Sequence, residues 1–204
     1  MGETSNDQRS QPLPKGSDWL LPFLPRLRAG GRRLLEAGCG PGLDAATLTA
    51  AGFEVVAFDR APLERAKRQA PSTMLLRADL RRPLPFRDGA FDCAVSSLAL
   101  HYLPWDETRA AFGEIRRVLG EGSAFLFRVN ADDDVNHGAG AGEELEPNFY
   151  RTPHPSYSET KRFFDEAMVH RAVARLFEVE QLEHRTIHRY ADPKRVWECL
   201  ARAV

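Results

Sequence analysis

Short apolar runs alternate with segments of helical character along most of the chain. Five apolar runs are predicted to be buried strands, at residues 33–37, 54–58, 73–77, 91–95 and 123–129. Three segments between them carry helix signals and are predicted to be helices, at residues 43–51, 62–70 and 105–119. Strands that alternate with helices imply a parallel sheet with right-handed crossovers. The pattern therefore predicts an α/β fold, a doubly wound and mostly parallel sheet with helices on both faces.

The pattern changes after the fifth predicted strand. Residues 130–155 hold an acidic run, three glycines and three prolines, which predict a long irregular excursion. Ser156 and Glu159 have capping-box spacing and predict a helix that extends to about residue 174. Residues 177–182 are predicted to form a strand. Residues 196–201 are predicted to form either a last, antiparallel strand or a terminal helix, and we favour the strand.

The composition is that of a globular protein. The 204 residues are 43% hydrophobic and 28% charged, which is enough for one domain with a sizeable core. The 28 Lys and Arg residues balance 29 Asp and Glu residues, so no global charge favours nucleic acid. No apolar run approaches the ~20 residues that cross a bilayer, and the polar start lacks a signal-peptide core. We therefore expect a soluble, cytoplasmic protein that binds neither membrane nor nucleic acid.

The cysteines and the acidic run predict no metal site. Cys39, Cys93 and Cys199 are far apart and form no CxxC pair, so packing is their expected role. The acidic residues 132–134 and the nearby His137 have no evident convergent geometry, and a solvated loop is the interpretation we favour.

Three glycines at alternate positions follow the first predicted strand. Gly38, Gly40 and Gly42 interrupt the apolar run, and a predicted helix starts immediately afterwards. A tight turn of this kind needs positive φ and a close approach of the backbone to a ligand, and glycine permits both. The helix that follows directs unpaired N–H groups and its positive dipole end toward the same place. The turn is therefore a candidate site for a nucleotide-type cofactor.

Two acids stand at the ends of the next two predicted strands. Asp59 follows the glycines by about 20 residues, where a carboxylate accepts both hydrogen bonds of a ribose diol. Nicotinamide and adenosyl cofactors both have such a ribose. Asp79 closes the third strand, one strand further along the same edge, where an exocyclic adenine amine is its natural partner.

Residues 33–129 resemble the class I S-adenosylmethionine-dependent methyltransferases, especially the group that acts on small molecules. Residues 36–42, Glu-Ala-Gly-Cys-Gly-Pro-Gly, are similar to the first motif of that family, and residues 91–102 are similar to its fourth-strand motif. The resemblance implies a Rossmann-like sheet, S-adenosylmethionine as the cofactor and methyl transfer to a small-molecule acceptor.

The resemblance also implies roles for individual residues. Gly38 and Gly40 pack against the methionine part of the cofactor, and Asp59 holds the ribose. Asp79 and Leu80 frame the adenine, and a backbone oxygen of Ser96 or Ser97 meets the methionine ammonium. The candidate cofactor-binding residues are Glu36, Gly38, Cys39, Gly40, Asp59, Arg60, Asp79, Leu80, Ser96 and Ser97.

The resemblance places His101 and Tyr102 close to the transferred methyl group. Methyl transfer from a sulfonium is an in-line displacement in which alignment supplies much of the catalysis. For a hydroxyl or amine acceptor His101 is the candidate base, because the pKa of a histidine is near neutrality. The alternative is that His101 packs against the cofactor.

The domain organisation follows from these assignments. Residues 1–14 are expected to be a flexible segment, and residues 15–204 a single domain. Within it, residues 33–129 form a cofactor half and residues 130–175 an acceptor-side excursion, which we expect to act as wall and lid. Its polar residues Asn130, His137, Asn148 and Tyr150 face either the acceptor or solvent.

Three other functions compete with methylation of a small molecule. A methyltransferase of RNA or protein needs a basic or aromatic docking surface, which the sequence does not show. A nicotinamide-dependent oxidoreductase is disfavoured because residues 38–42 depart from GxGxxG and because Asp79 is then unexplained. A module that binds the cofactor without catalysis stays open.

Overall fold

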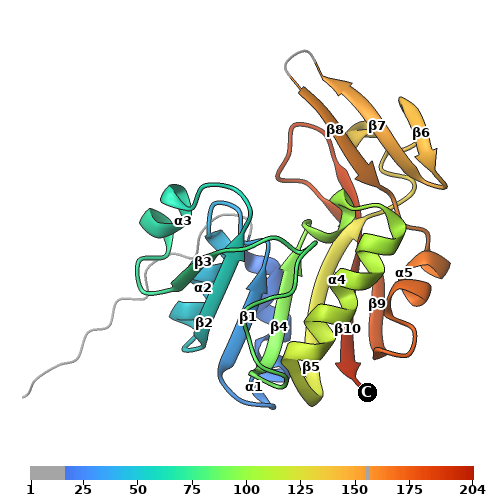
Figure 1. The fold of residues 1–204 in the computed structure, drawn as a ribbon. Coiled ribbons are helices and arrows are strands. Elements are labelled where there is room, and N and C mark those ends of the chain that lie inside the picture. The colour runs from blue at the N-terminus through green and yellow to red at the C-terminus, as the bar shows by residue number, and fades with distance from the viewer. Residues whose placement is uncertain (1–16, 155–156) are drawn as a thin grey trace, which may run out of the picture.

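A seven-stranded mixed sheet forms the centre of the computed structural model, which describes residues 17–154 and 157–204 (Figure 1). Five parallel strands are followed by two antiparallel ones. Their order across the sheet is β3 (Met74–Arg77), β2 (Glu54–Asp59), β1 (Arg33–Ala37), β4 (Phe91–Ser97), β5 (Leu119–Asn130), β10 (Lys194–Ala203) and β9 (Phe177–Ile187). The predicted doubly wound sheet and its antiparallel C-terminal strand are confirmed.

Helices cover both faces of this sheet. One face carries η1 (Asp18–Phe23), α1 (Leu24–Arg28), α2 (Leu43–Ala50) and α3 (Glu64–Gln69). The other face carries η2 (Leu100–Tyr102), α4 (Trp105–Val118) and α5 (Glu166–Val173). None of the helices within residues 17–154 and 157–204 has the length and apolar content needed to span a bilayer. The segment 1–14, expected to be flexible, lies outside the described residues.

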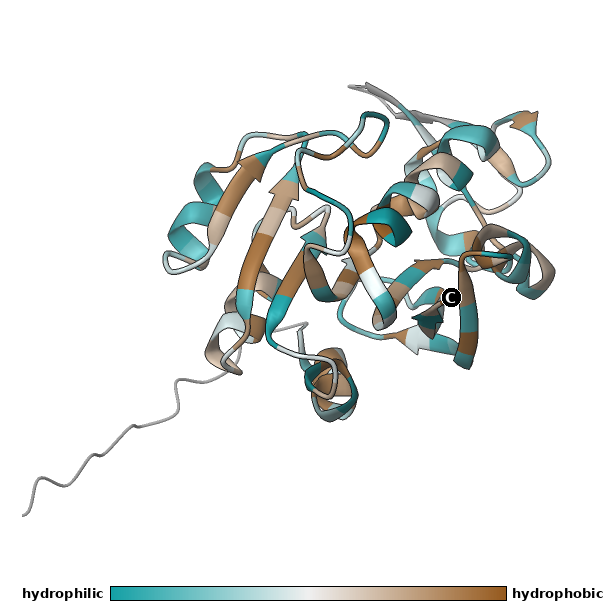
Figure 2. Ribbon diagram, turned by 60° about the horizontal axis from the view of Figure 1, so that its bottom comes forward, coloured by the Kyte–Doolittle hydropathy of each residue, from teal (hydrophilic) through white to brown (hydrophobic). Residues whose placement is uncertain are grey.

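The side chains of the central strands point alternately to the two faces of the sheet and contribute to two hydrophobic cores, one on each face. Phe125, Phe127 and Val129 of β5 pack with α4 and α5, whereas Ala124 and Leu126 pack with the helices of the opposite face. Successive side chains of a strand point to opposite faces, so a strand buried on both sides reads as a continuous apolar run. Figure 2 shows the resulting concentration of hydrophobic residues on the central strands.

The segment after β5 is more regular than the sequence indicated. It contains η3 (Val135–His137) and a three-stranded antiparallel sheet of β6 (Glu143–Glu146), β7 (Phe149–His154) and β8 (Tyr157–Arg162). In Figure 1 this second sheet stands beyond the ends of β5 and β10. The predicted irregular excursion is therefore wrong, because the glycines precede β6 and Pro147 separates β6 from β7, while Pro153 lies within β7.

The predicted helix from residue 156 to about 174 is also wrong. Residues 157–162 are β8, and Ser156 lies outside the described residues. The helix begins only at Glu166, where the side chain of the N-cap residue Asp165 accepts a hydrogen bond from the backbone N–H of Met168. An Asp N-cap is as effective as Ser, and sequence spacing alone did not distinguish the two starts.

A buried arginine attaches the second sheet to the body of the protein. The side chain of Arg162 is 1% exposed and its guanidinium lies over the rings of Trp105 and Phe149, at 5.5 and 4.8 Å from their centres. It pairs with Glu146 and donates to the carbonyl oxygen of Pro147 at 3.0 Å. Because a charge this deeply buried needs such partners, these contacts fix β8 against α4.

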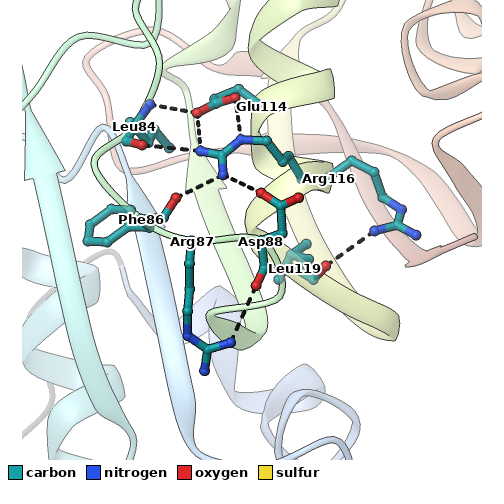
Figure 3. A network of polar contacts seen from close by, with 8 residues as sticks. Leu84, Phe86, Arg87, Asp88, Glu114, Arg116 and Leu119 are labelled. Atoms are coloured by element: carbon teal, nitrogen blue, oxygen red, sulfur yellow. Dashed lines mark hydrogen bonds and ion pairs between the residues drawn. The ribbon is translucent and has the colours of Figure 1, made fainter.

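A second arginine fastens the loop between β3 and β4 to α4 (Figure 3). Arg117 donates to the carbonyl oxygens of Leu84 and Phe86, at 3.1 and 2.8 Å, and pairs with Asp88 at 2.7 Å. Glu114 binds the same guanidinium and also accepts from the backbone N–H of Leu84. One side chain therefore holds three points of the loop.

Replacement of Arg117 by alanine is expected to lower the free energy of unfolding by about 1–3 kcal/mol, because two partly buried carbonyl groups lose a charged donor. Urea denaturation measures this change. The matched control is Arg87→Ala in the same loop, because the one hydrogen bond of its side chain within residues 17–154 and 157–204 is a 3.5 Å contact with the carbonyl of Asp88. Equal losses of unfolding free energy in the two variants would contradict the role of Arg117 in holding the loop.

Candidate functional site

The glycine turn joins β1 to α2 and takes a form that other residues rarely adopt. Gly38, Gly40 and Gly42 have φ of +78°, +50° and +82°. The N–H groups of Gly38 and Cys39 both donate to the carbonyl oxygen of Phe58, at 2.9 and 3.0 Å. A Cβ at Gly38 would lie 2.2 Å from the Cβ of Ala99. The turn is therefore fixed against both neighbouring strands and exposes its backbone on the remaining side.

A cavity of about 620 Å³ opens beside this turn, at the carboxyl ends of the parallel strands. Residues from the turn, from the ends of β2, β3 and β4 and from two later segments share its wall. Of the candidate cofactor-binding residues, those that line the cavity are Glu36, Gly38, Cys39, Gly40, Asp59, Arg60, Asp79, Leu80 and Ser97. This is the position at which open α/β sheets bind ligands.

Asp59 is held in place by two backbone donors. Its Oδ2 accepts from the N–H of Gly40 at 2.8 Å, and its Oδ1 accepts from the N–H of Ala61 at 2.9 Å. Each carboxylate oxygen has further acceptor capacity. The carboxylate is thus oriented before any ligand arrives and links the end of β2 to the glycine turn.

Asp79 lies one strand further along the same edge. Its carboxylate pairs with the guanidinium of Arg81 and accepts from the Arg81 backbone N–H at 3.0 Å. The side-chain hydrogen bond from Arg81 is the main reason that the pKa of Asp79 falls to about 2, and burial opposes it. Asp79 therefore stays ionised at neutral pH and presents an acceptor to the cavity, beside Leu80.

Glu36 is an acid in an unusual environment. Its side chain is 3% exposed, and within the described part of the chain its Oε2 has no hydrogen-bond partner. Burial raises the pKa of Glu36 well above its ordinary value, and the negative charges of Asp44 and Asp59 add to the shift. Because an unpartnered buried oxygen is costly, the group suits a ligand that brings an N–H or ammonium donor.

The two serines at the end of β4 differ in position. Ser96 is fully buried and its Oγ donates to the carbonyl oxygen of Ala37 at 2.9 Å, so its side chain links β4 to β1. Ser97 lines the cavity, and its Oγ accepts from Arg128 at 2.9 Å. Of this pair, only Ser97 belongs to the cavity wall.

His101, the candidate base, is buried behind the wall. It is 2% exposed, is absent from the cavity lining, and packs its ring 4.2 Å from that of Tyr102, which does line the cavity. Burial lowers the pKa of His101 well below 6.5, and the positive charges of Lys194 and Lys161 lower it further. The geometry therefore gives His101 a packing position and not that of a base in contact with an acceptor.

Stability should depend on pH through His101. The folded state keeps this ring neutral, whereas the unfolded chain binds a proton below about pH 6.5, so stability is lost as pH falls below that value. We expect His101→Phe to reduce the loss of unfolding free energy between pH 7.5 and 5.5 by about 1 kcal/mol. Urea denaturation at both pH values tests this, with exposed His170→Phe as the control; an unchanged pH dependence in His101→Phe would contradict it.

The cavity wall also includes residues that the sequence did not single out. Glu159 of β8, and Arg189 and Tyr190 between β9 and β10, line the cavity with Tyr102 and Leu103. The polar residues proposed for this wall, Asn130, His137, Asn148 and Tyr150, do not line it. Asn130 is instead fully buried at the end of β5. The arginine–tyrosine pair follows the largely polar strand β9, so no local pattern in the sequence marked it.

The described residues show no assembled metal site. They contain no group of three or more His, Cys, Asp or Glu side chains that could hold an ion. Cys39, Cys93 and Cys199 are free and buried, and burial raises the pKa of each thiol to about 12. The thiols are therefore poor nucleophiles.

Comparison with known proteins agrees with this geometry. Residues 35–127 match the family model described as a methyltransferase domain. A malonyl-[acyl-carrier protein] O-methyltransferase of Erwinia billingiae is 32% identical over 124 residues, which are 58% of this chain and 47% of the relative. The chain spans about half the length of the curated relatives it matches.

Solved structures share the whole fold. A methyltransferase of Methanosarcina mazei has a TM-score of 0.75 at 18% identity and covers 90% of this chain and 97% of its own. A 1,6-didemethyltoxoflavin-N1-methyltransferase of Burkholderia thailandensis, crystallised with that compound and S-adenosylhomocysteine, has a TM-score of 0.67 at 18% identity over 93% and 80% of the two chains.

Residues 35–127, which contain the glycine turn and both strand-end acids, are therefore similar to the methyltransferase domain, and the fold is that of S-adenosylmethionine-dependent methyltransferases.

Proposed function

We propose that the chain transfers the methyl group of S-adenosylmethionine to a small-molecule acceptor bound in the same cavity. The observation that carries the proposal is that one cavity joins the glycine turn and both strand-end acids to a wall of later residues. Asp59 and Asp79 suit the ribose and the adenine, and Glu36 suits the methionine ammonium. Each supplies acceptors to a ligand group that bears donors.

In this proposal the protein positions the reacting groups and excludes water from them. When bound, the cofactor supplies a methyl group on a positively charged sulfur. The residues of the glycine turn and Ser97 would hold its amino-acid end, while Tyr102 and Leu103 would exclude water from the reacting atoms. No described histidine lines the cavity, so the proposal assigns no side chain as the base.

A small acceptor is favoured by how the wall is built. Strand β8 and the loop after β9 close the cavity with single side chains, Glu159, Arg189 and Tyr190. The structure from Burkholderia thailandensis holds a small heterocycle, whereas the relative from Erwinia billingiae is named for a malonyl group carried on an acyl-carrier protein. Both names support, for this chain, an acceptor whose reacting group is small.

Titration calorimetry with S-adenosylmethionine and S-adenosylhomocysteine tests cofactor binding, and NADH is the matched competitor because it also carries an adenosine ribose. We expect micromolar or tighter binding of the two adenosyl compounds and none of NADH. Formation of S-adenosylhomocysteine in the presence of pooled small metabolites then tests turnover. Binding of NADH alone would overturn the assignment, and cofactor binding without turnover would favour a non-catalytic module.

A further inference from the structure

A buried guanidinium contacts one residue of the cavity wall. Arg128 of β5 is 4% exposed, and it does not itself line the cavity. Its Nε and Nη2 donate to the Oγ of Ser97, at 3.3 and 2.9 Å, and Ser97 does line the cavity. Arg128 therefore reaches a bound ligand through Ser97.

Donation from Arg128 decides what the Ser97 hydroxyl offers to a ligand. A hydroxyl has one hydrogen to donate and two lone pairs that accept. The Ser97 oxygen accepts from Arg128, and within residues 17–154 and 157–204 the Ser97 side chain has no other hydrogen-bond partner. Its hydrogen is therefore left for a group in the cavity, and a hydroxyl that accepts from a cation is a stronger donor. Ser97 thus presents a donor that suits an anionic oxygen.

Arg128 is held in place by an aromatic ring of the first helical turn. The centre of the Trp19 ring lies 3.8 Å from the guanidinium carbon of Arg128. Trp19 belongs to η1, and its Nε1 also donates to both carboxylate oxygens of Asp44, at 3.2 Å. Because stacking restricts the orientation of a planar guanidinium, Trp19 fixes the direction of the two N–H groups that Ser97 accepts.

The positive charge of Arg128 is kept although the residue is buried. Burial lowers its pKa to about 10, the charges of Asp44 and Glu198 oppose that shift, and the like charge of Arg189 adds to it. Glu198 is itself 7% exposed and lies opposite Arg128 in the pairing of β5 with β10. Arg128 therefore stays protonated at neutral pH, so its hydrogen bonds to Ser97 are charge-assisted.

We propose that Arg128 is a positioning residue for the amino-acid end of the cofactor. By donating to Ser97 Oγ, it turns the hydroxyl hydrogen toward the cavity, where that hydrogen bonds to a carboxylate oxygen of the cofactor. Trp19 holds the guanidinium in the orientation that this arrangement needs. The inference rests on the proposed function and adds a role for two residues that lie outside the cavity lining.

Calorimetry with two probes tests this arrangement. S-adenosylhomocysteine has the amino-acid end, whereas 5′-methylthioadenosine has the same adenosine and a thioether without it. We expect Arg128→Lys to weaken the binding of S-adenosylhomocysteine by about tenfold and to leave that of 5′-methylthioadenosine within about threefold of wild type. Lysine keeps the charge of arginine but has neither its two-donor fork nor its stacking plane.

Arg162→Lys is the matched control for this change. Arg162 is also buried and also lies over aromatic rings, but neither Arg162 nor its partners Glu146, Trp105 and Phe149 line the cavity. We expect this variant to lose stability in urea denaturation and to keep both affinities within about threefold of wild type.

A double variant shows whether Arg128 acts through Ser97. Ser97→Ala should weaken the binding of S-adenosylhomocysteine by about tenfold, and addition of Arg128→Lys should weaken it by no more than about threefold further, because the effects of coupled residues do not add. An additive loss of about a hundredfold in the double variant would overturn the inference. Retention of the wild-type affinity by Arg128→Lys would overturn it as well.

Variants of Trp19 supply a test that does not depend on how well Arg128→Lys folds, because Trp19 is only partly buried. Trp19→Phe keeps a ring beside the guanidinium, whereas Trp19→Leu removes it. We expect S-adenosylhomocysteine to bind Trp19→Phe within about threefold of wild type and Trp19→Leu at least about fivefold more weakly, with 5′-methylthioadenosine unchanged in both. Equal weakening of the two probes in Trp19→Leu would overturn the inference, because the ring would then support the cavity as a whole. Failure of the wild-type protein to bind S-adenosylhomocysteine would instead defeat the proposed function.

Discussion

Gly38→Ala is expected to abolish detectable binding of S-adenosylhomocysteine. The backbone at this position has φ of +78°, which costs an alanine about 1–2 kcal/mol. The new Cβ would also lie 2.2 Å from the Cβ of Ala99, and relief of such overpacking costs about 1–3 kcal/mol more. Because the turn itself must move, cofactor affinity should fall further than stability. Calorimetry and urea denaturation measure the two effects separately.

A double variant separates the clash from the backbone strain. Ala99→Gly removes the methyl group that the new Cβ meets, so Gly38→Ala combined with Ala99→Gly should recover part of the stability and of the affinity. Gly40→Ala is a further comparison, because no atom lies within 4 Å of a Cβ built there. If the double variant binds no better than Gly38→Ala, the contact with Ala99 does not control the turn.

Asp59→Asn is expected to weaken the binding of S-adenosylhomocysteine by about ten- to a hundredfold. One oxygen that accepts from Gly40 or Ala61 becomes an NH₂ donor, and the ribose loses a charged acceptor. Hydrogen bonds to charged groups contribute about 1.5–3 kcal/mol each, which corresponds to this range. Affinity is measured by calorimetry, and thermal unfolding reports the accompanying change in stability.

Asp92→Asn is the matched control for this carboxylate. Asp92 also accepts hydrogen bonds from two backbone N–H groups, those of Arg32 and Arg33 at 2.9 Å, but it lies near the start of β4 and does not line the cavity. Replacement of the Asp92 carboxylate by an amide should reduce stability and leave the affinity for S-adenosylhomocysteine within threefold of wild type. Equal affinity losses in the two variants would mean that Asp59 acts through the fold alone.

The order of the central elements could be predicted because each strand there is buried on both faces. The runs that became β1, β2, β4 and β5 are mainly apolar, so the type of each element is encoded locally. The end of β1 is also marked by a glycine and that of β2 by Asp59. The second sheet was missed because its strands are short and polar on the exposed side. The burial of Arg162 against Trp105 and Phe149 holds that sheet and arises from tertiary contacts alone.

Some residues of the candidate site could be predicted from the sequence, and others could not. Asp59 and Asp79 follow their strands directly, and parallel strands bring their carboxyl ends to one edge. The position of His101 was not readable, because whether a residue after β4 faces the cavity or the core depends on the 3₁₀ turn of residues 100–102. Arg189 was missed because its loop reaches the cavity through the buried Asp134, more than fifty residues earlier in the chain.

The segment between β5 and α5 is closed at its base. Ala131 and Phe164 form a parallel bridge, and the N–H of Phe164 donates to the carbonyl oxygen of Asn130 at 2.8 Å. The segment therefore leaves and re-enters the fold at adjacent backbone positions, so its length is not constrained by the frame that holds the glycine turn. An exchange of residues 132–163 would therefore leave the backbone of the parallel strands in place, provided that it keeps the contact of Asp134 with Lys194 and that of Arg162 with Trp105.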